Sequence, residues 1–202
     1  MTEPRRDIRI VILGDGLVSA AGDERGMGWV GRVTAKTPAL HPRIDIFALP
    51  APGETTTMLA ERWVPEVQRR FSTETDNRLV IALPNSDPAA GISISRSRLN
   101  IANIVDEAKK SGIESFLVGP IPSRNPQLNP EIEHLASGFE DVAVRRNIPF
   151  VDCYRPLAEH LGFNEELNNS EHGLPGQTGH GLIAWLVLNR GWYEWLDIEA
   201  QD

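Results

Sequence analysis

Cysteine is almost absent from this chain: Cys153 is the only one among 202 residues. A single cysteine excludes an internal disulfide, and we expect Cys153 to be a buried small apolar residue. No apolar run approaches the roughly 18 residues of a membrane helix. The polar segment from Met1 to Asp7 leads directly into a run too short for a signal peptide, which needs about 7–15 apolar residues. These absences predict a cytoplasmic protein without a membrane span.

Net positive charge is also lacking, because the formal net charge is -8. A phosphate backbone would be repelled, so nucleic acid is not an expected partner. The segment Gly14-Asp15-Gly16 lacks the third glycine of a dinucleotide-binding loop, and no cofactor is expected. Paired metal-ligand spacing is missing as well, and no metal site is expected. The histidines considered for such a site are His134, His160, His172 and His180.

What the chain does contain is the composition of an ordinary globular protein, with 41% hydrophobic and 24% charged residues. Its length suits one domain over residues 1–202. Five short apolar runs are bounded by glycine, proline or polar residues, and continuous apolar runs are typical of strands buried on both faces. The predicted strands are Ile8 to Leu13, Ile44 to Leu49, Leu79 to Leu83, Ser115 to Val118 and Pro149 to Asp152.

Segments with apolar residues at helical spacing lie between most of these strands. The alternation predicts an α/β three-layer sandwich, in which right-handed crossovers place helices on both faces of a parallel sheet. The predicted helices cover residues 55–71, 98–110, 130–146 and 178–188. We expect Trp185, Trp192 and Trp195 to pack in the core and at the C-terminus.

Ligands of open α/β sheets bind outside the carboxyl ends of the strands, near the point where the strand order reverses. The sequence therefore predicts a site in the loops that follow the strands. Those loops contain Gly14-Asp15-Gly16, residues 50–54, residues 84–87 and residues 119–122, and the turn at residues 171–176 is expected to face the same way.

These loop residues carry a family resemblance that runs nearly from end to end of the chain. The order of Gly14-Asp15-Gly16-Leu17, residues 28–32, 49–56, 84–87, 118–122 and 147–152 resembles the blocks of the SGNH hydrolases, also called GDSL lipases or acylhydrolases. The resemblance implies a flavodoxin-like five-stranded sheet and an esterase ancestry. It also implies that Gly53 donates a backbone N–H to an oxyanion hole and that Asn85 takes the place of the oxyanion asparagine.

Two departures from the family pattern concern proton transfer. Gly16 stands at the position of the serine nucleophile, and Leu174 stands at the position of the catalytic histidine, while Glu171 replaces the acid. In a comparable serine hydrolase, loss of the serine or the histidine costs on the order of 10⁶ in turnover. About 10³–10⁴ over water remains from the oxyanion hole and binding. We therefore expect no ordinary serine-hydrolase activity.

Each of these positions also has a simpler interpretation. Gly16 is compatible with a tight turn as well as with a retained N–H donor, and Asp15 is expected to order its loop. Gly53 and Asn85 are interpreted as an oxyanion donor and a pocket-facing amide, with turn residues as the alternative. A register slipped by two residues makes His172 the base and places Asn169 at the acid position. His180 is expected to pack at the start of the last helix.

Three functional hypotheses follow. The first is a non-catalytic family member in which Gly16, Gly53 and Asn85 bind an acyl or carboxylate ligand beside an apolar wall at Leu174. The second is an active hydrolase in which Glu171 and His172 activate water. The third is a scaffold or interaction protein that uses only the fold. The oligomeric state is left open.

Overall fold

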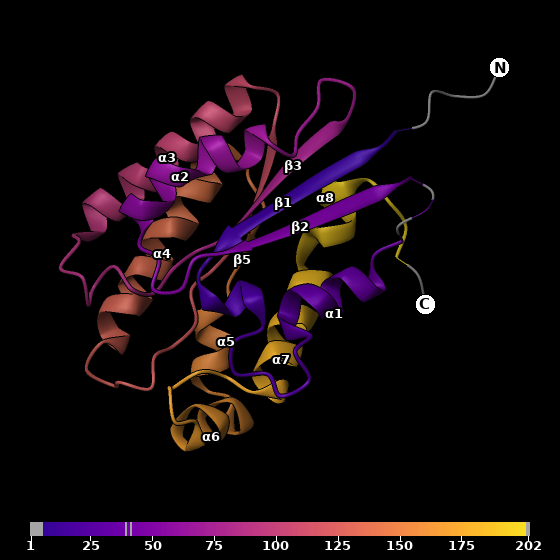
Figure 1. Cartoon of the computed structure of the whole chain (residues 1–202). Helices are drawn as coiled ribbons and strands as arrows, with labels where there is room; N and C mark the ends of the chain where they lie inside the picture. The colour runs from indigo at the N-terminus through magenta and orange to yellow at the C-terminus, as the bar shows by residue number, and fades with distance from the viewer. Residues whose placement is uncertain (1–5, 39, 41, 201–202) are drawn as a thin grey trace.

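All strands of the sheet run parallel, in the order β2-β1-β3-β4-β5. The structure is a computed structural model that describes residues 6–38, 40 and 42–200, so most of the polar segment from Met1 to Asp7 lies outside the described residues. β1 lies between β2 and β3, so the winding of the chain reverses beside it (Figure 1). The predicted flavodoxin-like parallel sheet is confirmed. The strands are β1 (Ile8–Gly14), β2 (Ile44–Pro50), β3 (Asp76–Ala82), β4 (Glu114–Val118) and β5 (Phe150–Val151).

Helices cover both faces of this sheet, which makes the predicted three layers. α1 and α7 contribute to one apolar cluster, and α2, α3 and α4 contribute to the other (Figure 1). The helices are η1 (Gly16–Ser19), α1 (Gly28–Lys36), α2 (Thr56–Gln68), α3 (Ile94–Lys110), α4 (Asn129–Arg146), α5 (Tyr154–Ala158), α6 (Leu161–Asn169), α7 (Gln177–Val187), η2 (Leu188–Trp192) and α8 (Tyr193–Leu196).

The central strand β1 shows why the apolar runs are continuous. Ile10 and Ile12 face the cluster that contains α1 and α7, whereas Val11 and Leu13 face the cluster that contains α2, α3 and α4. All four side chains are fully buried, because alternate residues of a strand point to opposite faces and both faces are covered. The sheet is therefore anchored on both sides close to the point where β1 ends.

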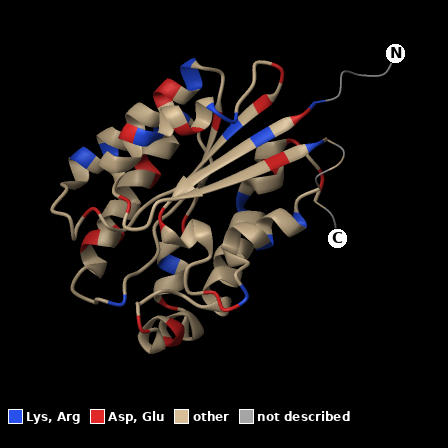
Figure 2. Cartoon of the chain, viewed as in Figure 1, with Lys and Arg blue, Asp and Glu red and all other residues tan. Residues whose placement is uncertain are grey.

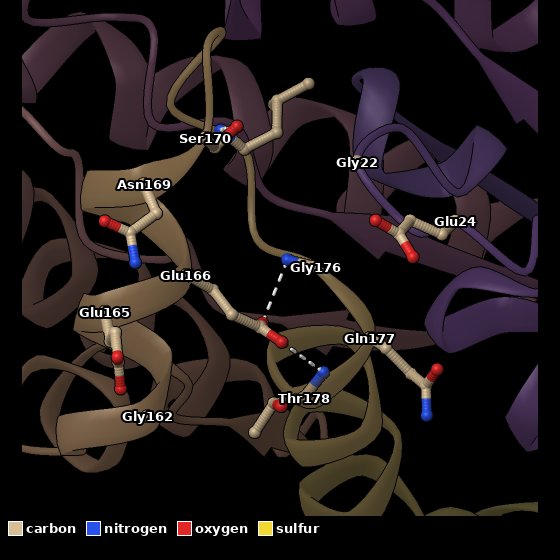
Figure 3. Close-up of a pocket in the computed structure, with 11 residues that line it drawn as sticks. Gly22, Glu24, Gly162, Glu165, Glu166, Asn169, Ser170, Gly176, Gln177 and Thr178 are labelled. Atoms are coloured by element: carbon tan, nitrogen blue, oxygen red, sulfur yellow. Dashed lines mark hydrogen bonds between the residues drawn. The ribbon is translucent and has the colours of Figure 1, made fainter.

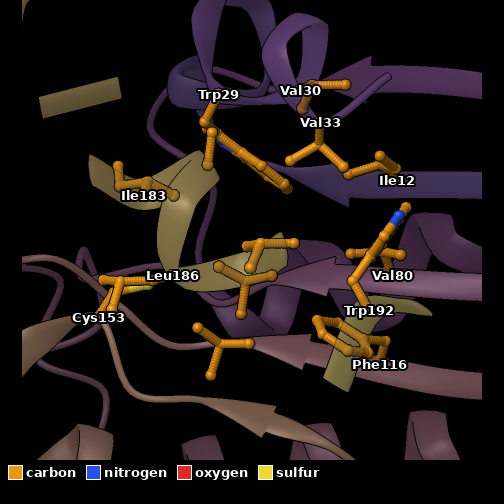
Figure 4. Close-up of a cluster of buried hydrophobic side chains, with 14 of the residues drawn as sticks. Ile12, Trp29, Val30, Val33, Val80, Phe116, Cys153, Ile183, Leu186 and Trp192 are labelled. Carbon is orange, nitrogen blue, oxygen red and sulfur yellow. The ribbon is translucent and has the colours of Figure 1, made fainter. Parts of the chain in front are cut away.

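Aromatic packing is only partly as predicted. Trp192 and Trp195 are buried beside Phe116, with ring centroids 5.1–5.5 Å apart, and Trp192 lies in the cluster of Figure 4. Cys153 is buried in the same cluster, as expected. The expectation for Trp185 was wrong: its side chain is 60% exposed, because it lies on the face of α7 turned away from the sheet.

Helix boundaries also differ from the prediction. α3 begins at Ile94, four residues before the expected start, because Ser93 caps it and its Oγ accepts the N–H of Arg96 at 3.3 Å. That first turn has little apolar character, so periodicity alone missed it. α5 and α6 were not predicted, since each is short and buries only two side chains, Tyr154 with Leu157 and Phe163 with Leu167.

Charged residues of both signs are interspersed along the helices and strand ends (Figure 2). None of the helices in residues 6–38, 40 and 42–200 has the length and apolar character needed to cross a bilayer.

Candidate functional site

The turn after β1 contains two glycines with different structural requirements. A Cβ at Gly14 would lie 2.7 Å from Ala82 Cβ and 2.9 Å from Val18 Cγ2, so packing requires glycine there. A Cβ at Gly16 would meet only Ala21 Cβ at 3.6 Å and Pro52 Cβ at 4.0 Å, which are ordinary contacts. The backbone of Gly16 is not left-handed. Position 16 therefore has room for a side chain and does not require glycine for the turn.

Asp15 orders this turn. Its Oδ1 accepts the N–H of Leu17 at 2.9 Å and caps η1. The side chain is half-buried, and burial raises the pKa of Asp15 although the Leu17 N–H opposes that shift. The loop-ordering contact expected from the sequence is therefore present. The same side chain also lines a small cavity described below.

The turn between β2 and α2 lies against the end of β1. The N–H of Ala51 donates to the Gly14 carbonyl at 2.8 Å, and Pro52 lies beside Gly16. Gly53 is exposed at the tip with φ +72°, a left-handed conformation that favours glycine. Within the described part of the chain, neither the Gly16 N–H nor the Gly53 N–H has a protein acceptor. Two unpaired donors thus occur on adjacent loops.

An ion pair between Glu54 and Arg62 stabilises this turn. Glu54 is fully buried and forms an ion pair with Arg62, whose Nη2 also donates to the carbonyls of Leu49 at 3.0 Å and Gly14 at 3.3 Å. Burial raises the pKa of Glu54, and Arg62 opposes that shift. The guanidinium therefore links the ends of β1 and β2 to α2.

Asn85 follows β3 and shares a cavity with Asp15. The cavity has a volume of about 20 Å³, which is room for roughly one water molecule, and its other walls are mostly apolar. Asn85 Nδ2 donates to the carbonyl of Ile121 at 2.9 Å, which uses one of its two amide hydrogens. Asn85 is thus fixed in orientation at the carboxyl edge of the sheet.

Asp87 is a site residue that the sequence analysis missed. It is fully buried, and its carboxylate accepts the N–H of Thr56 at 2.8 Å, the hydroxyl of Thr56 at 2.5 Å and the hydroxyl of Ser97. These bonds join the β3 loop to the first turn of α2 and to α3. Two features of the sequence could have indicated this contact. Asp87 lies two residues after Asn85, and Thr55-Thr56 is typical of the start of a helix.

The loop at residues 170–174 lies apart from that cavity. Glu171 and His172 are exposed, and Arg124 Nη1 holds the loop backbone by donating to the Ser170 carbonyl at 2.6 Å. Leu174 packs against Gly22, where an added Cβ would lie 2.9 Å from Leu174 Cβ. The structure therefore does not bring Glu171, His172 or Leu174 into the cavity that Asp15 and Asn85 line.

Leu174 instead lines a wide, open pocket of about 600 Å³ between the loop after η1 and α6 (Figure 3). Glu166 projects into this region and accepts the N–H groups of Gly176 at 2.9 Å, Thr178 at 2.7 Å and Gly179 at 2.7 Å. Burial raises the pKa of Glu166, but these N–H groups outweigh it and lower the pKa overall. The N-terminus of α7 is thus already capped by a carboxylate.

His180 is structural, as expected. It is fully buried, its Nδ1 accepts the Trp29 N–H at 3.1 Å, and its Nε2 lies 3.0 Å from the Ala21 carbonyl. These neighbours place the hydrogen on Nε2, and burial lowers the pKa of the ring. No group of three or more histidine, cysteine or acidic side chains suited to a metal ion occurs among the residues that the structure describes.

The strand order and the helices on both faces of the sheet define a flavodoxin-like α/β protein. A model of the GDSL-like Lipase/Acylhydrolase family matches residues 12–182. The chain belongs to that family. No curated protein sequence matches the chain at a significant level.

Solved structures agree with this fold. A lipase/acylhydrolase from Enterococcus faecalis is 20% identical, with a TM-score of 0.75 over 96% of this chain and 98% of that one. A psychrotrophic esterase from Pseudoalteromonas sp., in a structure inhibited by monoethylphosphonate, is 20% identical, with a TM-score of 0.70 over 94% and 98%. An acetylxylan esterase from Geobacillus stearothermophilus is 16% identical, with a TM-score of 0.71 over 96% and 97%.

Proposed function

We propose that this chain is an acyl-binding member of the GDSL-like family that does not hydrolyse esters by a serine mechanism. Position 16 carries the proposal. The turn has room for a side chain there, since a Cβ would make only ordinary contacts, and yet the residue is glycine. Glycine supplies a backbone N–H but no nucleophile. We interpret Gly16 as a lost catalytic serine and not as a residue that the turn demands.

One of the structurally similar enzymes supports this interpretation. A catalytic mutant of the acetylxylan esterase, in which alanine replaces a serine, matches this chain with a TM-score of 0.69 at 16% identity. A serine side chain thus matters for catalysis in that relative. Leu174, which we assign to the histidine position, cannot accept a proton, and it packs against Gly22. Neither the nucleophile nor its base is then present.

The donors that we assign to ligand binding are all neutral. They are the Gly16 N–H, the Gly53 N–H and the second amide hydrogen of Asn85, which follow three adjacent strands. Preorganised neutral donors suit an acyl carbonyl or an oxygen anion, because they need no reorganisation on binding. We also propose a cytoplasmic location, which the single buried Cys153 supports because the chain has no disulfide to form.

The test is turnover of p-nitrophenyl acetate and of longer acyl esters by purified protein. We expect background rates, unchanged by His172→Ala. Hydrolysis that survives repurification and disappears in His172→Ala would overturn the proposal and support water activation by Glu171 and His172. Both of these side chains are exposed. A protein that neither hydrolyses esters nor binds acyl ligands would be better described as a scaffold.

A further inference from the structure

A second cavity lies at the amino end of β4, on the side of the sheet that α3 and α4 cover. It has a volume of about 220 Å³, which is room for several water molecules, whereas the cavity beside Asp15 holds about one. Its walls come from the C-terminal parts of α3 and α4, the turns that follow these helices, and the first residues of β4. Of the described residues, none lines both cavities, which therefore lie at opposite ends of β4.

Ser115 contributes a hydroxyl group without a partner to this cavity. Ser115 and Leu117 lie two residues apart on β4, so both side chains face the layer of α3 and α4, where Leu117 is buried. Ser115 is 5% exposed, and its Oγ has no hydrogen-bond partner within the described part of the chain. A buried hydroxyl without a partner costs free energy, and a ligand that hydrogen-bonds to it removes that cost.

Two charged side chains of opposite sign line the same cavity. Lys109 belongs to the last turn of α3, Glu114 is the first residue of β4, and both side chains are exposed. They form no ion pair with each other, and neither is paired with any other side chain that the structure describes. One ammonium group and one carboxylate group are thus available to a ligand.

The third charged group at the cavity is already neutralised. Arg146 donates from Nε and Nη2 to the two carboxylate oxygens of Asp106, each at 2.8 Å. The hydrogen bond from Arg146 is the main cause of the lowered pKa of Asp106, and the charge of Lys109 adds a smaller part without forming an ion pair. Arg146 is therefore a wall of the cavity, and Lys109 is the cation that remains for a ligand.

The apolar walls of the cavity are aliphatic, with surface from Val105, Ile113 and Ile148. A simple anion would meet Glu114 as well as Lys109, and a simple cation would meet Lys109 as well as Glu114. A zwitterion with an aliphatic group matches all of these features, because each of its charges has an opposite partner and its side chain has an apolar wall.

We infer that this cavity binds a small aliphatic α-amino acid. Its carboxylate lies at Lys109, its ammonium group at Glu114 and its side chain against the aliphatic wall, and the hydroxyl of Ser115 is a further hydrogen-bond partner. The inference goes beyond the proposed acyl binding and does not depend on it, since the two cavities have no described residue in common.

The test uses L-leucine and two analogues that each lack one of its charges, isocaproate and isoamylamine. NMR titration at pH 7 follows the amide signals of Gly112, Ser115 and Asn147, which line the cavity. We expect L-leucine to shift these signals with a dissociation constant of about 1 mM or below. Each analogue should bind at least tenfold more weakly, because it leaves Lys109 or Glu114 without an opposite charge.

Two variants remove the charges one at a time. Lys109→Met and Glu114→Gln keep the approximate size of the side chain, and each should weaken L-leucine binding at least tenfold. Lys110→Met is the matched control, because it removes the same charge as Lys109→Met from the next residue of α3, which does not line the cavity. It should change the affinity for L-leucine less than twofold.

Ser115→Ala separates a role in binding from a role in folding. The variant should bind L-leucine at least threefold more weakly, and its urea midpoint without ligand should be no lower than that of the wild type, because the hydroxyl has no partner to lose. A lower midpoint together with unchanged L-leucine affinity would overturn the assignment of Ser115 to the site.

Three results would overturn the inference as a whole. The first is that about 10 mM L-leucine leaves the three amide signals unmoved. The second is that isocaproate or isoamylamine binds as tightly as L-leucine, since a single charge would then suffice. The third is an equal loss of affinity in Lys109→Met and Lys110→Met, because net charge and not the cavity would then explain the binding.

Discussion

Substituting the two glycines of the β1 turn separately tests whether position 16 tolerates a side chain. A methyl group at Gly14 would lie 2.7 Å from Ala82 Cβ and 2.8 Å from the Ala82 carbonyl oxygen, which is backbone and cannot rotate away. Overpacking of this kind costs about 1–3 kcal/mol. At Gly16 the nearest atoms are 3.6 Å and 4.0 Å away, so serine is expected to change stability by less than about 0.5 kcal/mol.

Urea unfolding followed by tryptophan fluorescence measures both effects, since Trp29 and Trp192 are buried in the core beside β1. We expect Gly14→Ala to lower the transition midpoint clearly and Gly16→Ser to leave it nearly unchanged, with equal m-values. For a chain of this length, each 1 kcal/mol also shifts the melting temperature by about 2–4 °C. A loss of more than about 1 kcal/mol in Gly16→Ser would refute the reasoning, because glycine would then be needed for the turn itself.

Two further predictions concern buried acids. Asp87→Ala should destabilise the chain by about 3 kcal/mol or more in urea unfolding, because the Thr56 N–H and the hydroxyl groups of Thr56 and Ser97 lose their acceptor. A loss of stability no larger than that caused by Ser97→Ala would contradict this prediction. The hydrogen bond from Arg32 lowers the pKa of Asp23 to about 2, below its ordinary value of 3.8. Because of this lowered pKa, ionised Asp23 contributes about 2 kcal/mol to the free energy of unfolding. That contribution is present above pH 3.8 and is lost as the pH falls through 2. The stability difference between wild type and Asp23→Asn should therefore shrink from pH 6 to pH 2, and a constant difference would exclude the linkage.

The sheet could be predicted from the sequence because its signal is local. β1 and β4 carry short apolar runs, which indicate burial on both faces. β2 was predicted from a similar run, but it is an edge strand in which only Ile44 is buried. The strand order then followed from the family resemblance. α6 could not be predicted in this way, since it is short and buries only Phe163 and Leu167, and its position depends on contacts with α7.

The site was less predictable because its contacts join distant segments. The sequence indicated that Gly16, Gly53 and Asn85 follow neighbouring strands, which the strand order confirms. It did not indicate that Asn85 donates to Ile121, 36 residues away, or that Asp87 reaches Thr56 and Ser97. Such pairs depend on the approach of three loops, which no single segment encodes.

The contacts that hold these loops in place are made by residues other than Gly16 and Leu174. Gly14 sets the spacing between β1 and β3, Arg62 ties the ends of β1 and β2 to Glu54, and Asp87 joins the β3 loop to α2. Each contact is complete with glycine at position 16. Under the proposed function, glycine in place of a serine at position 16 would therefore leave the loop geometry intact, and the N–H groups of Gly16 and Gly53 would remain because they belong to the backbone. On this proposal, acyl binding and ester hydrolysis depend on different atoms of the site.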